Sequence, residues 1–205
     1  MSNVEDMHCM FESCRKFEGK GLENWDVSKV KEMSSMFMNC ENFNCDLTKW
    51  HVSKVKDIHC MFEGCENFEG KGLENWDVSN VEDIKNAFRR CRKFNADLSN
   101  WKLISVTRMH GVFFGCENFE GKGLENWDVS EVTGMSNIFG LCEIFDCDLS
   151  KWNVSNVTTM YNMFSHCKRF KGKGLENWDV SKTRNMHNMF YGCDSLKNIP
   201  SWYKE

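Results

Sequence analysis

Apolar residues recur along the chain in a fixed pattern that is anchored by tryptophan. Successive tryptophans are 25, 26, 25, 26, 25, 26 and 24 residues apart. A period of this length is typical of a solenoid, in which each unit buries its apolar side against its neighbours. We therefore predict that residues 1–205 form one solenoid domain of eight units. Each unit ends near one of the tryptophans Trp25, Trp50, Trp76, Trp101, Trp127, Trp152, Trp178 and Trp202.

The first half of each unit has the apolar spacing of a short amphipathic helix. In one unit the apolar positions are Val30, Met33, Met36, Phe37, Cys40 and Phe43. At about 100° per residue they fall within an arc of roughly 140°. Ser28 precedes them as a predicted N-cap, and one later unit has Ile104 in that place.

The second half of each unit has the pattern of a short strand. Leu22, Trp25 and Val27 have the spacing L-x-x-L-x-L. Trp25 and Val27 would point to one face of the strand and Asp26 to the other. The fold class predicted from both halves is an α/β repeat. It is a leucine-rich-repeat-like solenoid with a parallel sheet on one face and short helices on the other.

Two kinds of turn alternate between the halves, which gives a longer period of 51 residues. The long turn, residues 68–73, contains Gly-Lys-Gly, and the short turn, residues 43–47, contains Asn-Cys-Asp. The long turns contain Lys20, Lys71, Lys122 and Lys173. They lack the G-x-x-x-x-G-K-[ST] pattern of a phosphate loop, so the repeated lysine indicates a turn type.

Charge narrows the classes of partner. The chain has 26 basic and 30 acidic residues, interleaved along the sequence, and a net charge of −4. A nucleic-acid-binding protein needs a basic patch, so no nucleic-acid partner is expected. The sequence also has no long apolar run and no signal-peptide pattern at residues 1–6. We expect no membrane insertion and, by default, an intracellular location.

Eight of the twelve cysteines occupy one position of the repeat, as small buried hydrophobic residues do. They are Cys14, Cys40, Cys65, Cys91, Cys116, Cys142, Cys167 and Cys193. We expect reduced thiols, with a disulfide between neighbouring units as the alternative. Four Cys-x4-Cys pairs have wider spacing than most structural zinc sites, so no metal or cofactor is expected.

Polar residues around each tryptophan form the candidate binding strip. The tryptophans themselves are predicted to be a buried stack, with an exposed platform for sugars or peptides as the alternative. The outward positions of the predicted strand would form a partner-binding surface about two residues wide. This strip consists of Asn24, Asp26, Lys49, His51, Asn75, Asp77, Asn100, Lys102, Asn126, Asp128, Lys151, Asn153, Asn177 and Asp179.

The repeated motif also carries a family resemblance. The pattern Trp-Asp-Val-Ser-x-Val-x-x-Met-x-x-Met-Phe-x-x-Cys resembles the BspA-like leucine-rich-repeat surface proteins, and residues 55–65 match its helical half. The similarity is greatest to the Mycoplasma-type subgroup with repeats of about 25 residues. It implies a leucine-rich-repeat fold over the whole chain, and adhesion is proposed for surface members. It supplies no catalytic residues.

The function predicted from these features is a non-enzymatic scaffold that binds an unknown protein partner through the exposed sheet face. One alternative is a structural protein that associates with itself through its end repeats. The other is an adhesin-like binder of carbohydrate or protein. The largest departure from the repeat, Lys102-Leu103-Ile104, is interpreted as drift.

Overall fold

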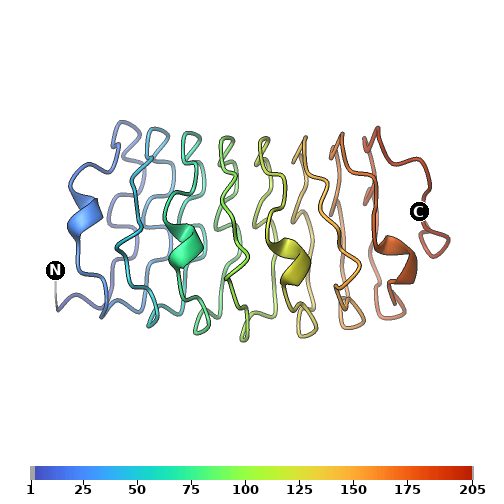
Figure 1. The fold of residues 1–205 in the computed structure, drawn as a ribbon, viewed down its shortest axis with the longest axis horizontal. Helices are drawn as coiled ribbons and strands as arrows, with labels where there is room; N and C mark the ends of the chain where they lie inside the picture. Colours follow the sequence, from blue (N-terminus) through green and yellow to red (C-terminus); the bar gives the residue numbers. More distant parts are fainter. Residues whose placement is uncertain (1–2, 205) are drawn as a thin grey trace.

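The chain is wound into coils that stack along one axis, with its two ends at opposite ends of the stack (Figure 1). This arrangement is seen in a computed structural model that describes residues 3–204. The helices are four single 3-10 turns, η1 (Leu22–Asn24), η2 (Leu73–Asn75), η3 (Leu124–Asn126) and η4 (Leu175–Asn177). Isolated parallel bridges join neighbouring coils, as between Glu32 and Asp57.

The helix predicted from Ser28 to Phe43 is wrong, and the structure has no α-helix within residues 3–204. This segment forms successive tight turns, in which the amides of Met36 and Cys40 donate to carbonyls three residues earlier. A turn every three residues points the same apolar side chains inward as a helix does. The backbone conformation distinguishes these turns from a helix, because Ser35 and Asn39 have φ of 54° and 60°. A right-handed helix contains no residue in that left-handed region.

The sheet predicted at Leu22–Val27 is also wrong, because the parallel bridges between coils lie in the other half of the unit. Leu22–Asn24 forms η1, whereas the parallel bridges lie at Glu32 and its equivalents. From there, every second amide donates to the next coil. The bonds join Met33 to Asp57, Ser35 to His59 and Phe37 to Met61, at 3.0, 2.9 and 2.9 Å. The half predicted as a helix thus carries the bridges between coils, whereas the half predicted as a strand contains the four 3-10 turns of residues 3–204.

Ladders of aromatic rings fill the interior. One phenylalanine per coil stacks on the next from Phe11 to Phe190, with centroid distances of 5.6–6.0 Å. A second ladder runs from Phe17 to Phe170, and its spacing alternates between 5.4–5.6 Å and 6.3–6.4 Å. The ring spacing in this second ladder therefore alternates from coil to coil, as the long and short turns do. Packed ring pairs contribute roughly 0.5–1.5 kcal/mol each beyond the burial of their area.

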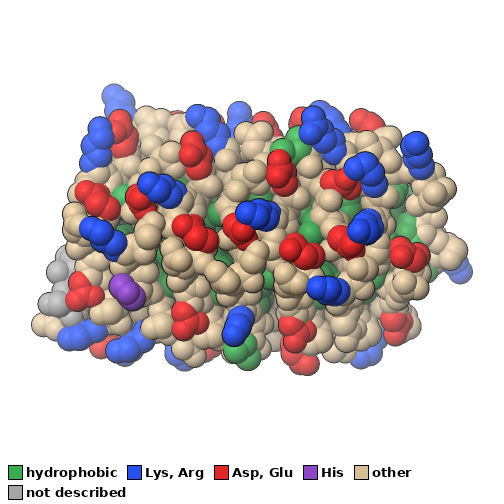
Figure 2. Space-filling model, in the orientation of Figure 1, with side chains coloured by type: hydrophobic (Ala, Val, Ile, Leu, Met, Phe, Trp, Pro, Cys, Tyr) green, Lys and Arg blue, Asp and Glu red, His purple; other side chains and the backbone are tan. Residues whose placement is uncertain are grey.

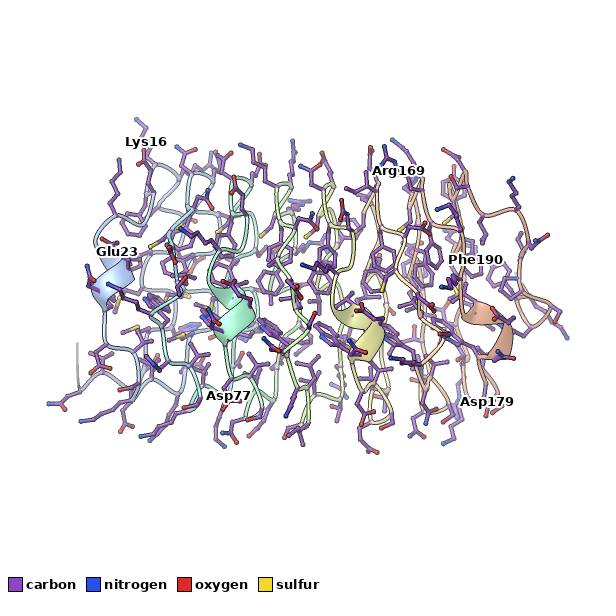
Figure 3. All side chains as sticks on the ribbon, viewed as in Figure 1. Lys16, Glu23, Asp77, Arg169, Asp179 and Phe190 are labelled. Atoms are coloured by element: carbon purple, nitrogen blue, oxygen red, sulfur yellow. The ribbon has the colours of Figure 1, made fainter. Side chains whose placement is uncertain are left out.

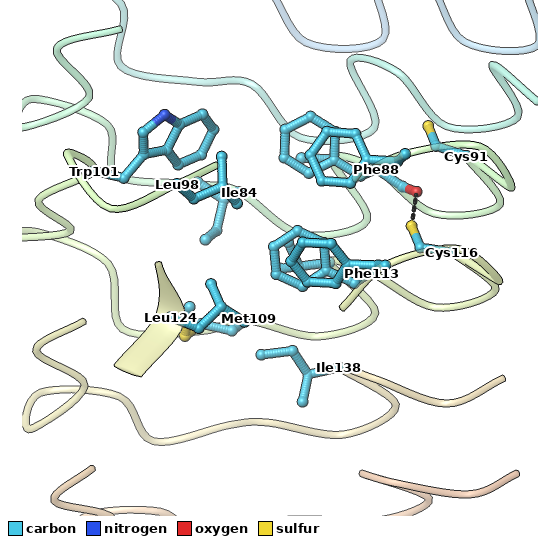
Figure 4. Close-up of a cluster of buried hydrophobic side chains, with 14 of the residues drawn as sticks. Ile84, Phe88, Cys91, Leu98, Trp101, Met109, Phe113, Cys116, Leu124 and Ile138 are labelled. Carbon is cyan, nitrogen blue, oxygen red and sulfur yellow. Dashed lines mark hydrogen bonds between the residues drawn. The ribbon is translucent and has the colours of Figure 1, made fainter. Parts of the chain in front are cut away.

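The repeated cysteines form a third ladder. Each thiol from Cys40 to Cys193 donates to the carbonyl of a phenylalanine in the preceding coil, at 3.0–3.1 Å. Figure 4 shows one such bond, from Cys116 to the Phe88 carbonyl. All twelve cysteines are free thiols. Burial raises the pKa of the Cys40 thiol to about 11, which keeps it protonated and able to donate.

Candidate functional site

Every residue of the candidate binding strip is exposed, as the sequence predicted. Asp77 and Asp179 mark the side of the stack along which it runs (Figure 3). Because no cross-coil bridge lies at these positions, the strip is a row of turns and is not a sheet face. Acidic and basic side chains are interleaved over the face shown in Figure 2.

The aspartates of the strip close local turns. The Oδ1 atom of Asp26 accepts the amide of Ser28 at 3.1 Å, and Asp77 accepts that of Ser79 at the same distance. Asp128 and Asp179 do the same with Ser130 and Ser181. The serine hydroxyl and amide lower the pKa of the Asp77 carboxyl. The serine predicted as a helix cap is therefore the partner in an Asx turn, and these aspartates have a structural role.

Other members of the strip bond to one another between coils. Lys49 Nζ donates to Asn24 Oδ1 at 2.9 Å, and Lys151 Nζ donates to Asn126 Oδ1 at 3.0 Å. Asn100 Nδ2 donates to the Glu74 carbonyl at 3.1 Å, and Asn153 Oδ1 accepts the amide of Ser155 at 3.1 Å. Four members of the strip have side chains with no hydrogen bond or ion pair within residues 3–204, namely His51, Asn75, Lys102 and Asn177.

The surface changes character at Lys102-Leu103-Ile104, where the other coils have Asp-Val-Ser or a close variant. The Ile104 side chain is 68% exposed, which is the largest exposure among the exposed large apolar residues. One hollow of about 470 Å³ is lined by Lys102, Ile104 and Asp128 among others. A second, of about 560 Å³, is lined by Asn75, Asp77 and the same Lys102 and Ile104. The sequence alone favours drift as the interpretation of this substitution, but the structure places it between two hollows in the middle of the strip.

Three of the four long-turn lysines hold neighbouring coils together, whereas Lys20 pairs with Glu18 of its own coil. Lys71 Nζ lies 2.6 Å from an Asp46 carboxylate oxygen, and Lys122 lies 2.7 Å from Asp97. Lys173 pairs with Asp148 in the same way. These lysines, with the Thr48 or Ser99 hydroxyl, lower the pKa of Asp46 and of Asp97 to about 2. The long turn therefore binds the carboxylate of the preceding coil, which accounts for its lysine without a phosphate ligand.

One group on the bridge side could hold a metal ion. The ligand atoms of Asp57, His59 and Asp83 lie within 4.8 Å of one another. However, His59 Nδ1 already lies 2.8 Å from Asp57 Oδ1, and Lys85 Nζ lies 2.6 Å from Asp83 Oδ2. Because these partners already occupy the carboxylates, we assign no metal to the group.

The tryptophans belong to the core. From Trp50 to Trp178 each indole is at most 6% exposed, and Trp50 stacks on Trp76 at 6.4 Å. The indole N–H groups donate to leucine carbonyls of the preceding coil, as Trp101 does to Leu73 at 2.9 Å. The exception is Trp76, whose buried Nε1 has no acceptor among the described residues. The alternative of an exposed ring platform is thus excluded for Trp50–Trp178.

The helical segments within residues 3–204 are single 3-10 turns, and none of them could span a membrane.

Comparison with solved structures finds leucine-rich-repeat proteins of bacteria. A leucine-rich repeat protein from Eubacterium ventriosum is 16% identical, with a TM-score of 0.51 over 86% of this chain and 44% of that one. One from Bacteroides ovatus is 17% identical, with a TM-score of 0.40 over 82% and 34%. A leucine rich cell surface protein from Faecalibacterium prausnitzii is 16% identical, with a TM-score of 0.40 over 84% and 65%. This chain therefore spans less than half the length of the first two.

The fold is thus a leucine-rich-repeat type of solenoid, as the likeness to the Eubacterium protein shows. Curated proteins gave no match. The family described as "Mycoplasma protein of unknown function, DUF285" matches residues 1–101 and 82–203. The predicted resemblance to Mycoplasma-type, BspA-like repeat proteins is confirmed, and the chain belongs to the DUF285 family.

Proposed function

We propose that the protein is a non-enzymatic interaction scaffold that binds a protein partner at the centre of the exposed strip. The observation that carries the proposal is Ile104, an apolar side chain that is 68% exposed between two hollows. Binding surfaces typically combine a central apolar anchor with a polar rim. Lys102 and Asn75 supply polar groups that make no other hydrogen bond or ion pair within residues 3–204.

The proposal narrows the strip predicted from the sequence. Asp26, Asp77, Asp128 and Asp179 are engaged in their own turns, so their side chains are less free to bond to a partner. We also propose that residues 1–205 form one solenoid domain of eight units, in keeping with the phenylalanine ladder that runs from Phe11 to Phe190. An intracellular location remains part of the proposal and is checked by fractionation of native cells.

This proposal can be tested without disturbing the fold, because other coils show which residues are compatible with the turn at positions 102 and 104. The double variant Lys102→Asp and Ile104→Ser introduces the Asp-x-Ser pair that closes a turn at Asp77 and Ser79 in the preceding unit, which has the other kind of turn. It should fold at least as well as the unchanged chain and lose the partner. The unchanged chain and the variant are immobilised, proteins captured from native cells are identified, and binding of the purified partner is then measured by calorimetry.

A matched control removes an exposed isoleucine elsewhere. Ile199 is 60% exposed near the end of the stack, and Ile199→Ser should leave capture unchanged. A partner that binds the restored variant as tightly as the unchanged chain would show that the site lies elsewhere on the surface.

A further inference from the structure

One row of residues on the bridge side of the stack holds backbone amides in place. Neighbouring members of this bridge row form parallel bridges, such as Glu32 with Asp57 and Gly134 with Thr159. In five coils the side chain of the row accepts the amide two residues further along the chain, at 2.8–3.1 Å. The bridge row consists of Asp6, Glu32, Asp57, Asp83, Arg108, Gly134, Thr159 and Asn185, of which the first four and the last are the accepting residues.

Three successive coils lack this acceptor, because their bridge row holds Arg108, Gly134 and Thr159. A guanidinium group has no acceptor atom, and glycine has no side chain. The Thr159 hydroxyl lies 2.9 Å from that of Ser136, with which it forms a hydrogen bond. The amides that are left without an acceptor within residues 3–204 are those of His110, Ser136 and Tyr161.

Positive charge gathers at the first of these three coils. The Arg108 side chain is exposed and has no ion pair or hydrogen bond within residues 3–204. Burial lowers the pKa of His110, and the charges of Arg108 and Lys85 lower it further. The Asp83 carboxylate acts in the opposite direction, but its Oδ2 atom is already paired with Lys85 Nζ at 2.6 Å. An anion beside His110 would therefore meet a guanidinium group that no carboxylate neutralises.

The His110 ring supplies a further polar group at this place. A Cβ atom at Gly134 would lie 2.6 Å from both Cε1 and Nε2 of the imidazole. The ring therefore takes the space of the side chain that the bridge row lacks at Gly134. Neither ring nitrogen has a partner within residues 3–204, so the N–H of the neutral imidazole is available to donate to an acceptor from outside the chain.

The other coils show which chemical group fits the open amides. In the coil before Arg108, the Lys85 amide donates to a carboxylate oxygen of Asp83 at 2.9 Å. Four of the five acceptors in the bridge row are carboxylates, and the row has none from Arg108 to Asn185. Hydrogen bonds to an ionised acceptor are stronger than those between neutral groups. The three open amides, the free guanidinium group and the imidazole together favour carboxylates as the ligand.

We propose that the surface formed by Arg108, His110, Ser136 and Tyr161 binds an acidic segment of a protein partner. Aspartate or glutamate side chains of that segment accept the three amides that this chain leaves open, and Arg108 neutralises their charge. The inference rests on backbone amides and charges of the bridge side. It is therefore independent of the partner proposed for Ile104.

Fluorescence anisotropy of a labelled hexa-aspartate peptide, titrated with the full chain, tests the proposal. Hexa-aspartate should bind and hexa-asparagine should not, and added salt should weaken the binding. Absence of hexa-aspartate binding, equal binding of the two peptides, or tighter binding of a single-stranded DNA hexamer would overturn the proposal. Ile104→Ser should leave hexa-aspartate binding unchanged, and a loss of binding in that variant would place the peptide on the other surface.

Two pairs of variants separate the amides from the charge. Arg108→Ala and Arg108→Asn both remove the guanidinium group, but only asparagine can accept the His110 amide, as Asn185 does in its own coil at 3.1 Å. Arg108→Asn should therefore weaken hexa-aspartate binding about tenfold more than Arg108→Ala. Thr159→Asn should likewise weaken it relative to Thr159→Val, which leaves the Tyr161 amide open. Equal affinities within each pair, with all variants folded by circular dichroism, would contradict binding through the amides.

Discussion

Substitutions in the long turn can separate the two costs of adding a side chain, backbone strain and collision with the neighbouring coil. Gly21 and Gly72 precede η1 and η2 with nearly the same backbone, at φ of 94° and 97°. A Cβ atom at Gly21 would have no other heavy atom within 4 Å. At Gly72 it would lie 2.2 Å from the Thr48 nitrogen and 2.5 Å from the Leu47 carbonyl carbon.

The magnitudes follow from these contacts. The left-handed backbone costs an alanine about 1–2 kcal/mol at either position. At Gly72 the overlap involves backbone atoms that cannot rotate away, so the coils must separate locally at a further cost of roughly 1–3 kcal/mol. The free energy of unfolding of Gly72→Ala should therefore lie below that of Gly21→Ala by roughly 1–3 kcal/mol.

Urea unfolding, followed by tryptophan fluorescence and circular dichroism, measures the difference. Gly123→Ala is the internal replicate, because its Cβ would lie 2.2 Å from the Ser99 nitrogen, and it should match Gly72→Ala. Equal destabilisation by Gly21→Ala and Gly72→Ala would refute the reasoning, since the close approach of coils would then contribute nothing.

Three other predictions concern the tryptophan side chains, the cysteine ladder and the loss of stability at acid pH. Trp101 donates its indole N–H to a carbonyl and Trp76 does not, so Trp101→Phe should cost about 1 kcal/mol more than Trp76→Phe in urea unfolding; equal costs would count against the assigned bond. In a native thiol titration the exposed Cys14 should react quickly and the buried Cys91 only after unfolding, because burial raises the pKa of the Cys91 thiol; early labelling of Cys91, read by mass spectrometry, would contradict its burial. The Asp97 pKa is about 2 in the folded chain, below the ordinary value of about 3.9, so its stabilisation is present above that value and is lost as pH falls toward 2. Asp97→Asn should lower the free energy of unfolding by less than about 1 kcal/mol at neutral pH and by less still at about pH 2, where half of the folded chains carry a protonated Asp97; a loss of the same size at both pH values would refute the assignment.

Burial could be predicted from the sequence, whereas the path of the backbone could not. Phe37 and Trp76 are buried at positions that the repeat marks as core. The prediction of helices failed because hydrophobic spacing reports which side chains face inward, and a turn every three residues gives nearly the same spacing as a helix.

A second signal in the sequence pointed to the turns. The left-handed position occupied by Ser35 holds asparagine or glycine in the last five coils, namely Asn86, Gly111, Asn137, Asn162 and Asn188. These residues tolerate a positive φ, and five of them at one position argue against a helix.

The candidate site was located in part. Exposure of the strip followed from the alternation around Trp25 and Val27, and the structure agrees. The role of Asp77 was missed, although Asp-x-Ser or Asp-x-Thr in most units is the signature of an Asx turn. The exposure of Ile104 depends on how two neighbouring turns leave space on either side, which no local pattern encodes.

The alternation of lysine-bearing and aspartate-bearing turns sets how such an array can change in length. Lys71 needs Asp46 in the coil before it, and Lys122 needs Asp97. Loss of a single coil would bring two lysine turns together, or two aspartate turns, and would leave like charges side by side. Loss or gain of 51 residues, the distance from Trp25 to Trp76, keeps every pair intact. We therefore expect related chains to differ in length by even numbers of coils.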